Sequence, residues 1–136
     1  MSEKLQSYTP ERFVADATSV PLALILYRDD PTDSTAQEFI QRGIVFCEAL
    51  ERLAVIRSEG VFMPAELPMR QYLDGIVVHH PTIVDKFGEA SKMKKKLGRF
   101  LDPDYKVRKK DIQVVSSYFN LLANYLTGRN RVQKEN

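Results

Sequence analysis

Cysteine, histidine, tryptophan and long apolar runs are scarce in this sequence. The chain of 136 residues contains one cysteine, two histidines and no tryptophan. The single cysteine, Cys47, excludes an internal disulfide and a zinc site built from several cysteines. The N-terminal residues have no apolar signal-peptide core, and the longest apolar run, residues 20–27, is far shorter than the roughly 20 residues that cross a bilayer. We therefore expect a cytoplasmic protein and no membrane partner.

The sequence also lacks the motifs of known catalytic sites. No nucleophile elbow, phosphate loop or dinucleotide fingerprint is present. Cys47 lies in an apolar stripe, where a thiol behaves as a small hydrophobe. His79 and His80 are adjacent, and neighbouring helix positions do not face each other, so the two rings cannot readily share a metal. The acidic turn at residues 29–33 lacks the ligand spacing and the glycine of a calcium loop. We therefore expect no enzymatic activity, no cofactor and no metal.

The remaining composition is that of an ordinary globular domain. The chain is 43% hydrophobic and 28% charged, which argues against general disorder. Apolar residues recur at the 3–4 residue spacing of amphipathic helices, and no convincing pair of strands is present. The sequence thus predicts an all-α fold, a single-domain bundle of five to six helices spanning residues 1–136. Residues 1–8 and 129–136 are expected to be flexible tails.

Proline punctuates the N-terminal part of the chain. Thr9 followed by Pro10 predicts a helix start, with Thr9 as the N-cap, and Pro21 is expected to interrupt that helix. Residues 22–27 fit either a short buried helix or a strand. We favour a helix, because no second strand is available for pairing.

Three further helices are predicted from caps, prolines and periodicity. Ser34 with Gln37 is a capping-box pattern that opens the longest helix, at about residues 34–57. Another helix starts at Pro64, and the last spans about 109–127. The first and last of these are apolar on more than one face, which predicts that another helix, a partner protein or a second copy of the chain covers them. The six glycines are expected at turns.

Charge is sorted along the chain. Residues 1–91 hold 8 Lys/Arg and 14 Asp/Glu, whereas residues 92–136 hold 12 and 4, so a net charge of −6 is followed by one of +8. Between Lys92 and Lys110, nine of nineteen side chains are cationic and two are anionic. Such asymmetry bears on partners rather than on fold. The candidate binding residues are Lys92, Lys94, Lys95, Lys96, Arg99, Lys106, Arg108, Lys109 and Lys110.

These cations allow four interpretations. They form a solvated helix face, or they bind an acidic protein surface or second copy, nucleic acid, or an anionic membrane. Residues 81–101 either run as one unbroken helix with Gly88 in its interior or form a unit with the spacing of a helix-turn-helix and its turn at Gly88, although Lys94 stands where such motifs usually need a buried aliphatic. We expect a non-enzymatic interaction or regulatory module that presents a basic C-terminal surface to an acidic protein or to itself. Nucleic-acid binding through residues 92–110 is the alternative.

Overall fold

The computed structural model describes residues 9–127, and the structural statements below refer to these residues. The expected flexible tails, residues 1–8 and 129–136, lie outside them. The fold is all-α, as predicted: within the described range there are five α-helices, two 3-10 helices and no strand. The elements are α2 (Pro10–Asp29), α3 (Ser34–Glu59), η1 (Pro64–Glu66), α4 (Leu67–His79), η2 (Pro81–Glu89), α5 (Ala90–Phe100) and α6 (Lys109–Thr127).

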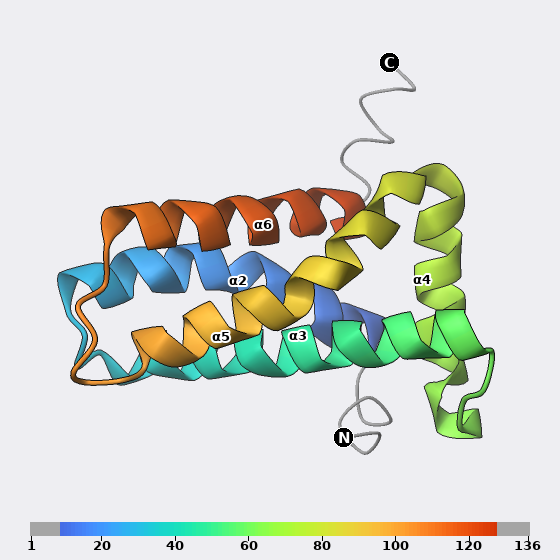
Figure 1. The fold of residues 1–136 in the computed structure, drawn as a ribbon, viewed down its shortest axis with the longest axis horizontal. Helices are drawn as coiled ribbons and strands as arrows, with labels where there is room; N and C mark the ends of the chain where they lie inside the picture. The colour runs from blue at the N-terminus through green and yellow to red at the C-terminus, as the bar shows by residue number, and fades with distance from the viewer. Residues whose placement is uncertain (1–8, 128–136) are drawn as a thin grey trace.

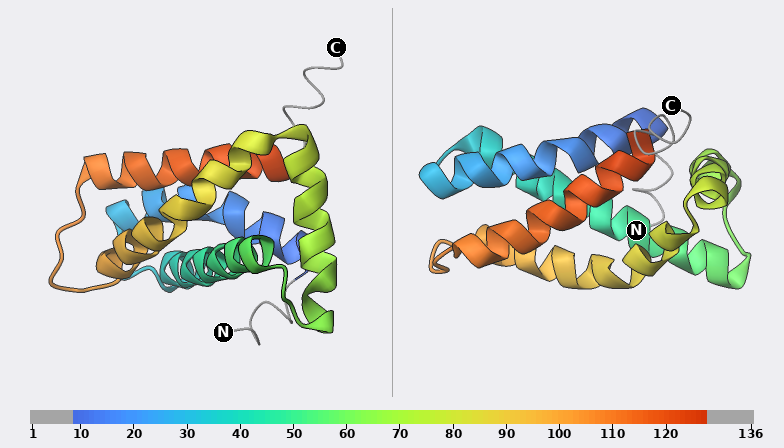
Figure 2. Two further views of the ribbon diagram at one scale, coloured as in Figure 1. Left: turned by 45° about the vertical axis from the view of Figure 1, so that its right-hand side comes forward. Right: turned by 90° about the horizontal axis from the view of Figure 1, so that it is seen from above.

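Four helices form the body of the bundle. α2, α3, α5 and α6 run along one direction, and α4 lies across their end (Figures 1 and 2). Their apolar stripes meet in the middle, where the ring of Phe46 stacks on Phe13 at 4.3 Å between centroids and meets Phe119 at 5.4 Å. All three rings are buried. The broad apolar surface predicted for the longest helix is therefore covered largely by the chain's own helices α2, α5 and α4.

Gly43 marks the closest approach of three helices. It is buried on α3, and a Cβ atom there would lie 2.8 Å from Cγ2 of Val20 and 3.1 Å from Cδ1 of Leu97. The absence of a side chain thus lets α2 and α5 both press against α3. Only Gly60, with a φ of 74° at the end of α3, has a conformation that requires glycine among the described residues. The expectation that glycines lie at turns is wrong for Gly43, Gly75 and Gly98, which lie within α-helices.

Pro21 does not interrupt the first helix. α2 runs unbroken from Pro10 to Asp29. Proline removes one backbone hydrogen bond, but Ala17, Val20 and Leu24 around it are buried, so packing of this face against α3 and α6 outweighs that loss. Residues 22–27 are helical, as favoured, yet they are not fully buried.

The helix starts are set by side chains close to the predicted caps. The hydroxyl of Thr9 accepts a hydrogen bond from the backbone N–H of Arg12 at 3.1 Å, which confirms the predicted N-cap. For α3 the cap is Asp33 rather than Ser34, because the Asp33 carboxylate accepts from the N–H of Ala36 at 3.1 Å. The negative charge of a carboxylate at this position also interacts favourably with the positive end of the helix dipole, whereas a neutral hydroxyl adds no such charge.

An ion pair between half-buried Arg52 and buried Glu66 fastens the α4 end of the molecule. The guanidinium of Arg52 donates two hydrogen bonds to the Glu66 carboxylate, at 2.8 and 2.9 Å, and the N–H of Met63 donates a third at 2.8 Å. The hydrogen bonds from Arg52 hold the pKa of Glu66 below its usual value. The chain leaving α3 is thereby folded back so that α4 can cross the bundle. As predicted, this segment becomes helical at Pro64, although its first turn is 3-10.

No helix-turn-helix forms at residues 81–101. η2 passes directly into α5, and Ala90, at the junction, has helical backbone angles of −59° and −42°. Gly88 does not take up a positive φ. Ile83 and Phe87 are buried along with Met93, so one continuous apolar stripe favours an uninterrupted helical path over a turn. Of the two arrangements that the sequence left open, the structure has the continuous helical path, and the lysines of α5 follow helical residues rather than beginning a helix.

Candidate functional site

The apolar stripe of α5 determines where its cations point. Ala90, Met93, Leu97 and Phe100 are buried at 3–4 residue spacing and set one side of the helix into the core. The intervening lysines must then project to the two flanks or outward. The structure accordingly separates the predicted basic cluster into groups with different surroundings.

Lys94 and Lys96 lie on opposite flanks of α5 and are both paired. The ammonium of Lys94 donates to the Glu51 carboxylate on α3 at 3.1 Å and lies 4.0 Å from Glu48. The bond to Glu51 raises the pKa of Lys94. On the other flank, Lys96 lies 3.6 Å from Asp111 of α6. These two residues tie α5 to its neighbours and are not free to bind a partner.

Lys92, Lys95 and Arg99 occupy the outer face of α5. Their spacing of three and four residues places them in one row, and all three are exposed. None has a salt bridge within the described part of the chain, whereas the other two α5 lysines do. We call this row the basic ridge.

Lys106, Arg108, Lys109 and Lys110 gather where the chain enters α6. They are exposed, and none forms a salt bridge to any residue that the structure describes. Within this region the Tyr105 hydroxyl donates to Asp111, which lowers the pKa of that carboxyl. The N-terminus of α6 adds a partial positive charge. We call these four residues the basic end; they lie at the end of the bundle opposite α4 (Figure 1).

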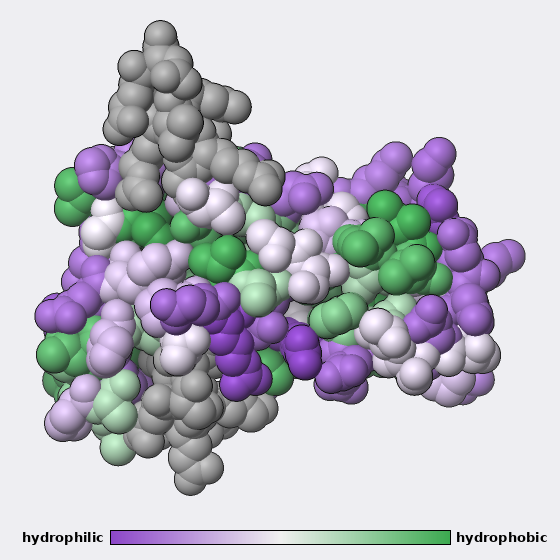
Figure 3. Space-filling view, turned by 180° about the vertical axis from the view of Figure 1, so that it is seen from behind, coloured by the Kyte–Doolittle hydropathy of each residue, from purple (hydrophilic) through white to green (hydrophobic). Residues whose placement is uncertain are grey.

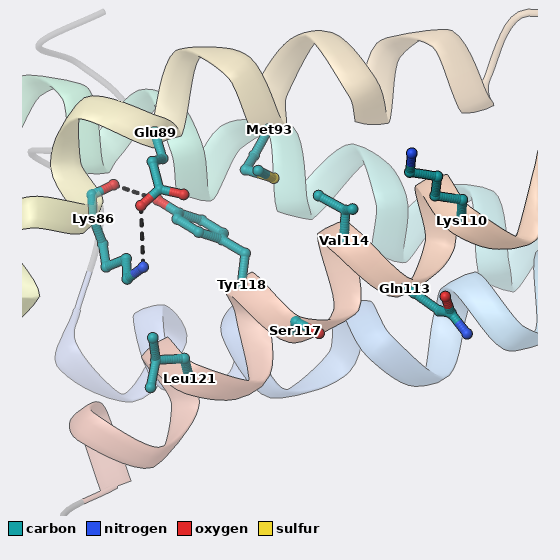
Figure 4. A pocket seen from close by; sticks show the side chains of 9 residues that line it. All are labelled: Lys86, Glu89, Met93, Lys110, Gln113, Val114, Ser117, Tyr118 and Leu121. Atoms are coloured by element: carbon teal, nitrogen blue, oxygen red, sulfur yellow. Dashed lines mark hydrogen bonds and ion pairs between the residues drawn. The ribbon is translucent and has the colours of Figure 1, made fainter.

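A groove adjoins the basic end, since Lys110 is one of its lining residues. It lies between η2–α5 on one side and α6 on the other and has a volume of about 530 Å³. Figure 4 shows the side chains that line it. They are Lys86, Glu89, Met93, Lys110, Gln113, Val114, Ser117, Tyr118 and Leu121.

The hydroxyl of Tyr118 joins the two walls of this groove. It donates to the backbone carbonyl of Lys86 at 2.8 Å, and the Lys86 ammonium in turn lies 3.1 Å from Glu89. Burial raises the pKa of Tyr118, so the phenol stays protonated. Part of the second apolar stripe predicted for α6 is thus covered by η2, while Val114 remains 38% exposed.

Apolar side chains also gather on the far face of the molecule. Leu22, Ile25 and Leu26 of α2 are 61%, 46% and 38% exposed. Figure 3, seen from behind, shows apolar surface on this side. Sequence reasoning placed these residues in a buried segment, because a run of six apolar residues does not reveal which of its faces meets the core.

The cysteine and histidines considered above as catalytic or metal-binding candidates do not form such a site in the described residues. The thiol of Cys47 is buried, which raises its pKa to about 12 and keeps it un-ionised. His80 is buried with its ring 4.9 Å from that of Tyr125, and His79 is exposed. Over residues 9–127, no three His, Cys, Asp or Glu side chains are grouped so that they could hold a metal ion. No helix in that range is long and apolar enough to cross a membrane.

Comparison with known proteins provides no relative. No family model matches the chain, and no curated protein or solved structure matches it.

Sequence reasoning found the cations but missed the groove. Its lining comes from two segments that lie far apart in the sequence, residues 86–93 and 110–121. One signal was present, namely the second apolar stripe of α6, which includes Val114, Tyr118 and Leu121. That stripe indicated a surface in need of cover, but only the fold shows which helix forms the opposite wall.

Proposed function

We propose that this protein is a non-enzymatic helical interaction module that binds an acidic polypeptide surface through its basic ridge and basic end. One observation carries the proposal. Of the nine predicted cations, only Lys94 and Lys96 are paired with internal carboxylates, and the other seven are exposed without a salt bridge in the described range. Unpaired surface charge of one sign raises the local concentration of oppositely charged partners and their association rate.

Three features support a polypeptide over nucleic acid as the partner. Residues 81–100 form no turn, so α5 is not set off from η2 as the recognition helix of a helix-turn-helix would be. Single strands are usually held by stacking on exposed aromatic rings, and the large hydrophobic residues exposed in the described range are all aliphatic. An apolar groove beside polar, cationic rims resembles the composition of protein interfaces.

The test compares two anionic probes on two charge variants. The probes are a fluorescent poly-glutamate peptide and a DNA duplex of similar total charge, measured by anisotropy at about 50 and 200 mM salt. In the ridge variant Lys92, Lys95 and Arg99 become Gln. Each lost contact is worth about 0.5 kcal/mol, so poly-glutamate binding should weaken about tenfold.

The matched control changes Arg28, Arg42 and Arg57 to Gln, which removes the same charge from exposed ion pairs elsewhere. We expect it to leave binding within about twofold of wild type. Equal losses in both variants would mean that net charge alone matters and would contradict the proposal. Tighter binding of the duplex than of poly-glutamate would instead favour the nucleic-acid alternative. Substituting Lys94 or Lys96 is a poorer test, since both also hold the fold together.

A further inference from the structure

The groove between η2–α5 and α6 has two different lips and an apolar floor. Met93, Val114 and Leu121 line its floor. Lys110, Gln113 and Ser117 line the groove on the α6 side. On the other side stand Lys86 and Glu89, which pair with each other at 3.1 Å. Lys92 of the basic ridge lies outside the lining, three residues and thus about one helical turn beyond Glu89. The floor is thus apolar, and both lips carry lysine.

Polar contacts connect the two walls of the groove at fixed positions. Near one end, the Lys96–Asp111 pair bridges α5 and α6 at 3.6 Å. Toward the other end, Tyr118 donates to the carbonyl of Lys86 at 2.8 Å, and the hydroxyls of Thr82 and Tyr125 lie 3.1 Å apart. The walls are therefore joined on both sides of Met93 and Val114. These contacts fix the position of the two walls, so the groove between them stays open.

We propose that this groove binds an amphipathic acidic α-helix of a partner protein. The inference deepens the proposed function and rests on it for the acidic character of the partner. Val114 and Leu121 are seven residues apart on α6, about 10 Å along the axis, which matches the i and i+7 anchors of a helix laid in a groove. Met93 opposite them is a flexible side chain that adapts to different anchors. Glutamates flanking such anchors meet Lys110 on one lip and Lys92 beyond the other.

The location of the groove disfavours a second copy as occupant. The chain's own exposed apolar segment, Leu22 to Leu26 on α2, lies on the face seen from behind in Figure 3, whereas α5 and α6 lie toward the viewer in Figure 1. Docking one face into the other would give a head-to-tail contact that adds copies without closing a pair. A helix from a different protein fills the groove without that consequence.

The experiment uses a labelled helical peptide of about 15 residues, with leucine at i, i+3, i+4 and i+7 and glutamate elsewhere. A second peptide keeps every glutamate but replaces the leucines by serine. Both are titrated against wild type, Val114→Asp and the matched control Val55→Asp. Val114 and Val55 have similar exposure, 38% and 40%, and Val55 lies on α3. Circular dichroism establishes that each variant is folded.

We expect the leucine peptide to bind wild type at least about tenfold more tightly than the serine peptide. Val114→Asp should remove that advantage, while Val55→Asp should keep it. Without any substitution, the methyl resonance of Met93, which lines the groove, should shift on addition of the leucine peptide. The resonance of Met69, which is buried on α4 away from the groove lining, should not. A Met93 resonance that does not move, or equal effects of the two Asp variants, would overturn the proposal.

Other occupants give distinct results. Concentration-dependent association of the wild-type protein alone that is lost in Val114→Asp would assign the groove to a second copy and overturn the proposal. If poly-glutamate binding depends on the ridge but the leucine peptide is indifferent to Val114, the groove inference fails and the proposed function stands. If binding of the leucine peptide needs Val114 but is equally tight with lysine in place of glutamate, the partner is not acidic. That result contradicts both the proposed function and the groove inference.

Discussion

The two flanks of α5 are held in opposite ways. Toward α3, Leu97 packs at Gly43 and Lys94 reaches Glu51, so the flank is closed by both packing and charge. Toward α6, the Lys96–Asp111 pair joins the helices near one end, and the groove runs alongside. The same short lysine-rich segment thus supplies two structural ties and an exposed row. Helical periodicity explains this, because positions two apart fall on different sides of a helix. Charge density in a sequence therefore overstates the charge available to a partner.

The largest effect is expected from a substitution on the flank of α5 that packs against α3. Gly43→Ala would place a methyl group 2.8 Å from the stiff side chain of Val20, so we expect a loss of about 2 kcal/mol in the free energy of unfolding despite the better helix propensity of alanine. Urea denaturation measures this.

Gly98→Ala is the control for that substitution. Gly98 is exposed on α5 and a Cβ there meets nothing within 4 Å, so this change should stabilise by about 0.5–1 kcal/mol. Stabilisation by both substitutions would show that α2 and α5 do not constrain α3 at Gly43.

A smaller loss of stability is expected from a substitution on the other flank, where the groove lies between η2–α5 and α6. Tyr118→Phe removes the donor to the buried carbonyl of Lys86 and should cost about 1 kcal/mol. The loss should be local, so amide hydrogen exchange in residues 81–89 should accelerate more than in α3. Tyr125→Phe removes a more exposed hydroxyl contact to Thr82 and should accelerate exchange less. Uniform acceleration throughout the bundle would argue that the groove wall is not an independent unit.

The smallest expected effect is the difference in unfolding free energy between substituting a paired lysine and substituting an exposed one. Lys94→Met should cost about 0.5–1 kcal/mol through loss of its contact with Glu51. Lys95→Met should change the unfolding free energy by less than about 0.5 kcal/mol. In about 1 M salt the difference between the two variants should shrink, since screening weakens the pair. A cost that is equal for both lysines at low salt would mean that the pairing with Glu51 contributes nothing.

Local patterns predicted most of the helices and some of their ends. The last helix was expected at about 109–127 and is found at Lys109–Thr127, because its apolar stripe and its flanking residues agree. The cap at Thr9 was also readable from neighbouring residues. Pro21 was misjudged, since the cost of a missing N–H is local whereas the compensating burial of Val20 and Leu24 comes from α3 and α6, which sequence order does not reveal.

The candidate site was predictable only as a list of charges. Which lysines pair depends on Glu51 and Asp111, the first of them forty-three residues away in the sequence. No local pattern shows that Lys94 faces α3 while Lys95 faces outward until the buried side of α5 is known. The sequence left a turn at Gly88 open for the same reason, because glycine permits a turn but does not require one, and the continuous burial of Ile83, Phe87 and Met93 in the folded chain favours a helical path.

The nine-residue 3-10 stretch η2 sets the length of the groove wall. At about 2.0 Å rise per residue it spans about 18 Å, whereas the same residues would span about 13.5 Å as an α-helix. The tighter winding also adds about half a turn over that length. The carbonyl of Lys86 consequently meets Tyr118, and Thr82 comes level with Tyr125. In α-helical form this wall would be about 4.5 Å shorter and turned by half a revolution, and the two helices would no longer be in register.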